Sequence, residues 1–273
     1  MYLLYHFILH VMKNKIKNRS MYYKYITNAS YDVLNDELIN SKIKDFVLQN
    51  IYVRSTILGL VLYARKLLKK NMSILDVGAG DCPYRTIFKD LNYSSTDFGE
   101  TNYHDFKHIN YLCSADNIPV KNESFDAILC TEVLEHVYNT ENVIKEFNRI
   151  LKKEGGLFIT IPFIFNVHEE PFDFTRYTHY FLKKILTDHG FKIKFITPRG
   201  GKFLCLGVLS QDLLLQKNKK YHHLFIYVLC YIPVIFPLLI INKYFKNIFI
   251  ILDKFFDNEK IWTPGYAIYT IKK

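Results

Sequence analysis

The sequence lacks paired cysteines, and this absence limits both the disulfide and the metal chemistry that the chain can have. Its five cysteines are scattered over 273 residues, are odd in number and include no Cys-x-x-Cys pair. The pattern argues against a disulfide framework and against a zinc site, and it is typical of free intracellular thiols. We therefore expect a cytoplasmic protein with no bound metal.

A signal peptide and internal repeats are also missing. Residues 1–15 contain an apolar stretch, but no positive charge precedes it and no small-residue cleavage site follows it. The stretch is too short to span a bilayer, so it favours an amphipathic or packed first helix.

With 49% hydrophobic and 23% charged residues, the chain has the composition of a globular protein. The net charge of +10 fits an anionic partner, either nucleic acid or a lipid surface.

The pattern of apolar residues changes near residue 73. Residues 1–72 show helical spacing, whereas the following residues alternate short apolar runs with helical stretches. This alternation predicts an α/β fold with a doubly wound sheet. We expect strands at 73–77, 92–98, 108–113, 125–130, 156–163, 191–198 and 263–273, and helices at 82–91, 132–137, 141–153 and 178–190.

A glycine turn, ILDVGAGDCPY at 74–84, follows the first predicted strand. Gly78 and Gly80 allow a sharp turn and a close approach of a ligand to the main chain. A dinucleotide site would have a third glycine where this chain has Pro83. Asp76 and Asp81 add negative charge, which repels a pyrophosphate and attracts an ammonium or sulfonium group.

Asp97 ends the second predicted strand, 17 residues after Gly80. An acid at that position of an α/β sheet can accept hydrogen bonds from both hydroxyls of a ribose. Together with the acidic glycine turn, it predicts a site for an adenosyl ligand that carries an amino acid.

With these motifs the chain resembles the class I S-adenosylmethionine-dependent methyltransferases over about 73–200 and 263–273. The resemblance implies a Rossmann-like, seven-stranded sheet, mostly parallel with an antiparallel last strand, and S-adenosylmethionine as cofactor. It implies a cofactor site made of Asp76, Gly78, Ala79 and Gly80 at the methionine, Asp97 at the ribose, and Phe98, Ser114, Ala115 and Asp116 near the adenine. Ser114 departs from the family, which often has an acid there, so either Ser114 or Asp116 is expected to contact the adenine amino group.

The run HEEPFDFTRYT at 168–178 resembles methyltransferases associated with surface carbohydrates or lipid-linked intermediates. By that analogy we expect a small or lipid-linked acceptor, either saccharide or isoprenoid-like. RNA or protein methylation and a non-catalytic adenosyl-binding scaffold are the alternatives.

Three residues that follow the fourth and fifth predicted strands are candidates for a general base: His136, His168 and Asp173. Each has an alternative role: His136 can orient a helix, His168 can be a solvated loop residue, and Asp173 can pair with Arg176. Thr131 and Glu132 are expected to line the cofactor pocket.

An uncharged apolar segment, 224–241, interrupts the α/β pattern. If it crossed a bilayer, the last strand would lie on the opposite side from its sheet, so we expect an insertion at 204–259 that contacts a membrane surface through 224–256 without crossing it. A soluble cap or dimer surface and a membrane-spanning helix are the alternatives. The expected organisation is thus a helical segment at 1–72, a cofactor domain at 73–203 plus 260–273, and the insertion. A peripheral position of the protein on the inner face of the membrane fits this organisation better than binding to nucleic acid does.

Overall fold

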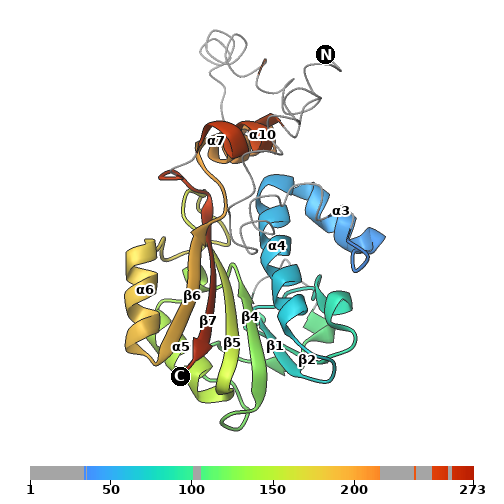
Figure 1. The fold of residues 1–273 in the computed structure, drawn as a ribbon, viewed down its shortest axis with the longest axis vertical. Coiled ribbons are helices and arrows are strands. Elements are labelled where there is room, and N and C mark those ends of the chain that lie inside the picture. The colour runs from blue at the N-terminus through green and yellow to red at the C-terminus, as the bar shows by residue number, and fades with distance from the viewer. Residues whose placement is uncertain (1–33, 35, 101–105, 216–236, 238–247, 258–259) are drawn as a thin grey trace.

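The computed structural model describes residues 34, 36–100, 106–215, 237, 248–257 and 260–273. Within them, a seven-stranded sheet has the order β3-β2-β1-β4-β5-β7-β6, with helices on both faces (Figure 1). Only β7 is antiparallel to its neighbours, which confirms the predicted mostly parallel sheet. The strands are β1 (Ser73–Val77), β2 (Asn92–Asp97), β3 (Tyr111–Leu112), β4 (Phe125–Thr131), β5 (Leu151–Pro162), β6 (Phe191–Pro198) and β7 (Gly265–Lys272).

Two helices precede β1, and the second of them covers one face of the sheet. The first, α3 (Ser41–Gln49), begins where the Asn40 side chain accepts a hydrogen bond from the Ile43 backbone N–H at 3.0 Å. The second, α4 (Ile51–Leu67), is apolar on almost every side because it packs on the sheet and also contacts α7 (Lys202–Leu215). Both lie in the segment for which the sequence predicts helices.

The opposite face carries α5 (Thr140–Ile150) and α6 (His179–Asp188). The apolar side of α5 contributes Ile144 and Phe147 to a core that also includes Ile128 and Ile159 of the central strands. Both faces of β4 and β5 are therefore buried, and the exposed parts of the parallel strands are their ends.

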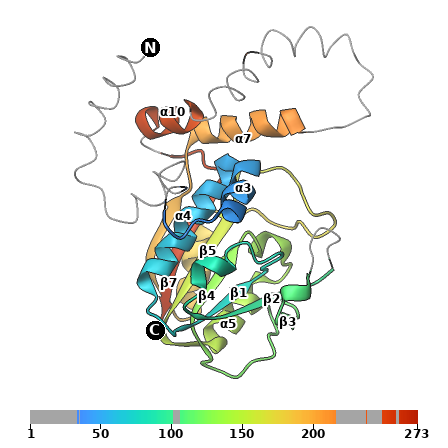
Figure 2. The ribbon, with the colours of Figure 1, turned by 90° about the vertical axis from the view of Figure 1, so that its right-hand side faces the viewer.

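Helices α7 and α10 (Ile248–Phe256) lie side by side beyond the carboxyl ends of the parallel strands (Figures 1 and 2). The Asp253 carboxylate accepts hydrogen bonds from the N–H groups of Gly201 and Leu204, and it pairs with Lys260 at 2.5 Å. These contacts tie the start of α7 to the end of α10. In the part of the chain that the structure describes, no helix combines the length and apolarity needed to cross a bilayer. The segment 224–241 lies outside that part, except for residue 237, and so does the apolar stretch within 1–15.

Several predicted boundaries are wrong. The helix expected at 82–91 is only a short 3-10 helix, Arg85–Phe88, and Cys82, at the start of the expected range, adopts a left-handed φ of 51° that an α-helix excludes. Similarly, only Leu134–His136 of the helix expected at 132–137 is helical, since Glu132 has a φ of 54°.

Two further differences concern strands. The strand expected at 108–113 is reduced to Tyr111–Leu112, because His108 ends a 3-10 helix that starts at Phe106 and because the Asn110 side chain, rather than a backbone carbonyl, accepts the Ser95 N–H. The helix expected to reach residue 153 ends at Ile150, and Leu151 already pairs with Phe125 as the first residue of β5.

Candidate active site

The glycine turn lies at the carboxyl end of β1, as the sequence predicts. The N–H groups of Gly78 and Ala79 both donate to the Thr96 carbonyl of the neighbouring strand. Gly78 has a φ of +66°, and a Cβ atom there would lie 2.3 Å from Val133 Cγ2. The turn therefore packs directly on the residues that follow β4, and glycine is required by both conformation and space.

Asp97 closes the turn from the adjacent strand. One carboxylate oxygen accepts the Gly80 N–H at 2.9 Å and the other accepts the Gly99 N–H at 3.1 Å. Phe98 next to it exposes 51% of its surface, with its ring edge-on to Phe172 at 6.2 Å. The carboxylate is thus held at the strand end beside an exposed aromatic ring.

Asp76 is buried beneath this turn. It is 1% exposed, and Tyr93 donates a hydrogen bond to its carboxylate at 2.7 Å. Burial raises the pKa of Asp76 to about 7, the Tyr93 hydrogen bond opposes this shift, and the negative charge of Asp97 adds to it. An added positive charge near Asp76 would favour its ionised form.

Asp76→Asn should change how stability depends on pH. The pKa is higher in the folded than in the unfolded protein, so the free energy of unfolding of the native protein falls as pH rises from about 4 to about 7. The variant should lack the part of this fall that Asp76 causes, and its free energy of unfolding at pH 8 should exceed that of the native protein by up to about 4 kcal/mol. Urea unfolding at pH 5 and pH 8 measures the difference. Asp188→Asn is the exposed control, and an identical pH dependence of native protein and Asp76→Asn would contradict the assignment.

The other predicted cofactor residues surround the same edge. The Cys113 N–H donates to the Asp97 carbonyl, so the half-buried loop of Ser114, Ala115 and Asp116 begins beside the acid. Thr131 is the last residue of β4, next to β1 in the sheet. The structure therefore brings these residues to the edge that carries the glycine turn.

Glu132 has a partner that the sequence did not reveal. Its carboxylate accepts a hydrogen bond from Arg199 at 2.8 Å, and Arg199 is 1% exposed at the end of β6. The same guanidinium donates to the Ile161 carbonyl and reaches the Thr56 hydroxyl. Arg199 thus links β4, β5, β6 and α4 behind the site, and the one sequence signal for it is a basic residue directly after a strand.

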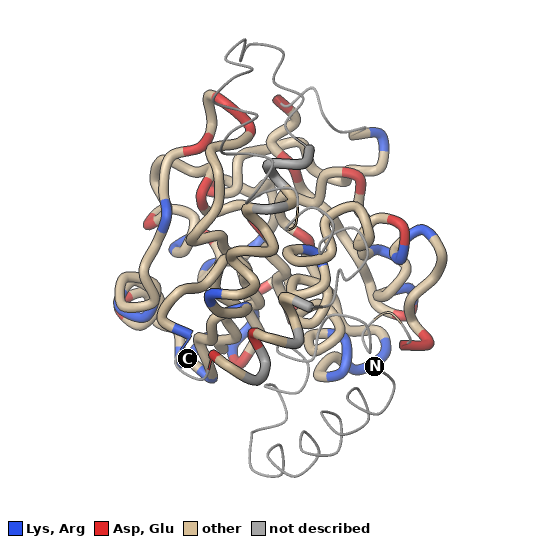
Figure 3. Tube along the Cα trace, turned by 90° about the horizontal axis from the view of Figure 1, so that it is seen from above, with Lys and Arg blue, Asp and Glu red and all other residues tan. Residues whose placement is uncertain are grey.

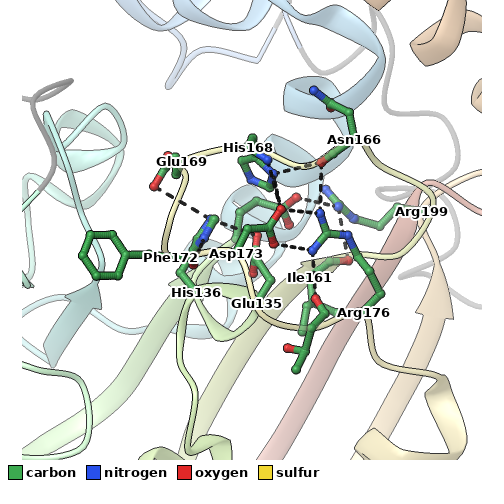
Figure 4. Close-up of polar contacts among 12 residues, drawn as sticks. Glu135, His136, Ile161, Asn166, His168, Glu169, Phe172, Asp173, Arg176 and Arg199 are labelled. Carbon is green, nitrogen blue, oxygen red and sulfur yellow. Dashed lines mark hydrogen bonds and ion pairs between the residues drawn. The ribbon is translucent and has the colours of Figure 1, made fainter.

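Two of the base candidates meet above β4 and β5. The rings of His136 and His168 lie 4.7 Å apart, with Glu135 beside them (Figure 4). The Nδ1 atom of His136 is hydrogen-bonded to the Phe172 carbonyl at 2.8 Å. Glu135 is fully buried, and both burial and the nearby charge of Glu132 raise the pKa of its carboxyl well above the usual range.

The third candidate, Asp173, binds two of its neighbours. It forms a bidentate ion pair with Arg176, at 2.5 and 2.8 Å, and accepts the His168 N–H at 3.0 Å (Figure 4). The Arg176 hydrogen bonds hold the pKa of Asp173 well below its usual range. A carboxylate so stabilised is a poor proton acceptor, so its geometry favours the alternative role of fixing the 166–176 loop.

Comparisons with known proteins find methyltransferases. A family model described as a methyltransferase domain matches residues 75–159. An uncharacterised protein of Methanocaldococcus jannaschii is 34% identical over 34% of this chain, and the ubiquinone biosynthesis O-methyltransferase of Pelagibacter ubique is 29% identical over 33% of it. Both matches span 42% of the relative's length.

Among solved structures, phosphoethanolamine N-methyltransferase 2 of Haemonchus contortus in complex with S-adenosyl-L-methionine aligns with a TM-score of 0.51 at 16% identity. The alignment covers 89% of this chain and 59% of that one, and at this identity it shows the fold. Residues 75–159 therefore match a methyltransferase domain, and the described residues have the Rossmann-like fold of the class I methyltransferases.

Proposed function

We propose that this chain binds S-adenosylmethionine at the carboxyl edge of β1, β2 and β4 and transfers its methyl group to a small or lipid-linked acceptor. The observation that carries the proposal is the Asp97 carboxylate, held by Gly80 and Gly99 at the end of β2 beside the glycine turn. An acid fixed at this point suits the two ribose hydroxyls. The exposed Phe98 ring offers a surface for the adenine.

The buried Asp76 supports the same ligand. Burial, together with the negative charge of Asp97, raises the pKa of Asp76. A cofactor ammonium or sulfonium near the glycine turn would supply a positive charge that stabilises both carboxylates. Methyl transfer from a sulfonium is an in-line displacement, so the protein mainly has to align the donor and acceptor and to exclude water.

The acceptor side of the proposal rests on the 166–176 loop. In this proposal an acceptor hydroxyl approaches His136 and His168. In its support, both rings lie beyond the ends of β4 and β5, next to Phe172, whose ring meets Phe98. A saccharide or isoprenoid-like acceptor fits the resemblance of residues 168–178. Lys and Arg positions in the described residues are interspersed with Asp and Glu (Figure 3), an arrangement that does not favour RNA. Membrane contact through 224–256 stays a prediction.

The experiment is a calorimetric titration of the full chain with S-adenosylhomocysteine, followed by incubation of cell extract with methyl-labelled S-adenosylmethionine. We expect one cofactor per chain and label in a single lipid, glycan or small-molecule fraction. Folded protein that does not bind S-adenosylhomocysteine would refute the cofactor site. Label only in RNA or protein would refute the acceptor class, and cofactor binding without methyl consumption would favour a scaffold.

A further inference from the structure

Three potential metal ligands converge beside the proposed acceptor site: Glu135, His136 and His168. Each offers one ligand atom, and these atoms lie within 4.8 Å of one another. The Nε2 atom of His136 is already 3.7 Å from a Glu135 oxygen. Ligand atoms around a metal with bonds of about 2.0–2.2 Å lie ~3–4 Å apart, so only small side-chain movements are needed.

Glu135 is the least expected member of this group. Both carboxylate oxygens are buried, and neither has a hydrogen-bond partner in the described residues. The nearby guanidinium groups are engaged elsewhere, Arg199 with Glu132 and Arg176 with Asp173. A buried carboxylate without a hydrogen bond or a cation is costly, and a bound metal ion would supply the missing partner.

The two imidazoles are oriented as metal ligands usually are. The Nδ1 atom of His136 lies 2.8 Å from the Phe172 carbonyl, and Nδ1 of His168 lies 3.2 Å from the Asn166 carbonyl and 3.3 Å from the Asp173 carboxylate. A ring whose Nδ1–H donates to such an oxygen presents an unprotonated Nε2 for a metal. The chain thus supplies both the ligands and the groups that orient them.

The backbone holds these parts together. The N–H groups of Phe174 and Thr175 donate to the Glu135 carbonyl, which fixes the loop that carries His168 against the turn that carries His136 (Figure 4). The side chains of His136 and His168 are 14% and 25% exposed, so an ion can reach them from solvent. Glu169, with an oxygen 3.8 Å from His136 Nε2, adds negative charge beside this imidazole.

We propose that Glu135, His136 and His168 bind a divalent transition-metal ion. Two imidazole nitrogens and one carboxylate suit Zn²⁺ and related ions rather than Mg²⁺ or Ca²⁺, which prefer all-oxygen sites. Three protein ligands leave a position open for an oxygen of the acceptor. Given the proposed function, an ion there would orient an acceptor hydroxyl and favour loss of its proton to solvent. The oxygen would then form a bond to the methyl carbon while the carbon–sulfur bond of the sulfonium breaks and S-adenosylhomocysteine leaves.

The test is zinc binding by the full chain after treatment with EDTA. Calorimetry with Zn²⁺, and elemental analysis after dialysis, should show one ion per chain. Glu135→Gln, His136→Gln and His168→Gln should each weaken binding at least tenfold. The control is His189→Gln, which removes an imidazole that also lies beside a glutamate, Glu141 at 3.2 Å, and it should bind as the native protein does.

Thermal unfolding separates loss of the site from loss of the fold. Glu135→Gln removes a buried acid, so its unfolding temperature without metal should equal or exceed that of the native protein, while the increase caused by Zn²⁺ should disappear. Absence of stoichiometric zinc, undiminished binding in the three variants, or binding of Mg²⁺ in preference to Zn²⁺ would overturn the proposal. Titration of the metal-free protein with S-adenosylhomocysteine tests the cofactor site independently, so failure of one proposal is distinguishable from failure of the other.

Discussion

Replacing Asp97 with alanine should weaken binding of S-adenosylhomocysteine about 100-fold or more. Loss of two hydrogen bonds from ribose hydroxyls to a charged group costs ~3 kcal/mol or more. The substitution also releases the N–H groups of Gly80 and Gly99, which the carboxylate holds. Calorimetric titration measures the change. Asp97→Asn, which keeps one acceptor oxygen, should give an intermediate loss.

Asp188→Ala is the matched control, because it removes an exposed carboxylate on α6 that pairs with Lys184. The affinity of this variant for S-adenosylhomocysteine should equal that of the native chain. If Asp97→Ala folds normally and still binds with native affinity, Asp97 does not hold the ribose and the proposed orientation of the cofactor is wrong.

Arg199→Met should lower the free energy of unfolding by about 2–4 kcal/mol. The guanidinium is buried among β4, β5, β6 and α4, and its removal leaves the Glu132 carboxylate without its cation. The Glu132 side chain is 21% exposed, so water offsets part of the loss. Urea unfolding measures this value, and Lys184→Met, at an exposed ion pair, should change it by less than about 1 kcal/mol.

The double variant Arg199→Met, Glu132→Gln identifies the cause. Because glutamine carries no charge, it should recover part of the stability that Arg199→Met loses. If the double variant loses the sum of the two single losses, the ion pair contributes nothing and the effect of Arg199 comes from packing alone.

The cofactor edge was predictable because its signals are local. Gly78, Gly80 and Asp97 are recognised by their places at the ends of two apolar runs, and parallel strands bring such ends to one edge. The conformation at Cys82 was not predictable, since a left-handed φ at a non-glycine residue has no sequence signature, and the helix expected after the turn was consequently too long.

Contacts between distant segments could not be read from the sequence. His136 and His168 are two separate base candidates in the sequence, and their convergence depends on β4 and β5 being neighbours and on the loop being tied to Glu135. Glu135 itself was missed because its apolar neighbours suggested an ordinary helix. Arg199 was missed because its partner, Glu132, is brought near it only by the order of the strands.

The position of β7 has a consequence for how the chain folds during synthesis. Among the described strands, β6 hydrogen-bonds to β7 alone, and β7 lies between β5 and β6. When a ribosome has completed residue 198, the strand 191–198 has no partner strand for backbone hydrogen bonds, and it gains one only when residues 265–272 emerge. The half of the sheet that carries the glycine turn can assemble earlier, whereas Arg199 reaches Glu132 only after the closing strand arrives. A ribosome-bound chain halted before residue 265 is thus expected to expose an unpaired strand edge, which is a binding site for chaperones and a risk for aggregation.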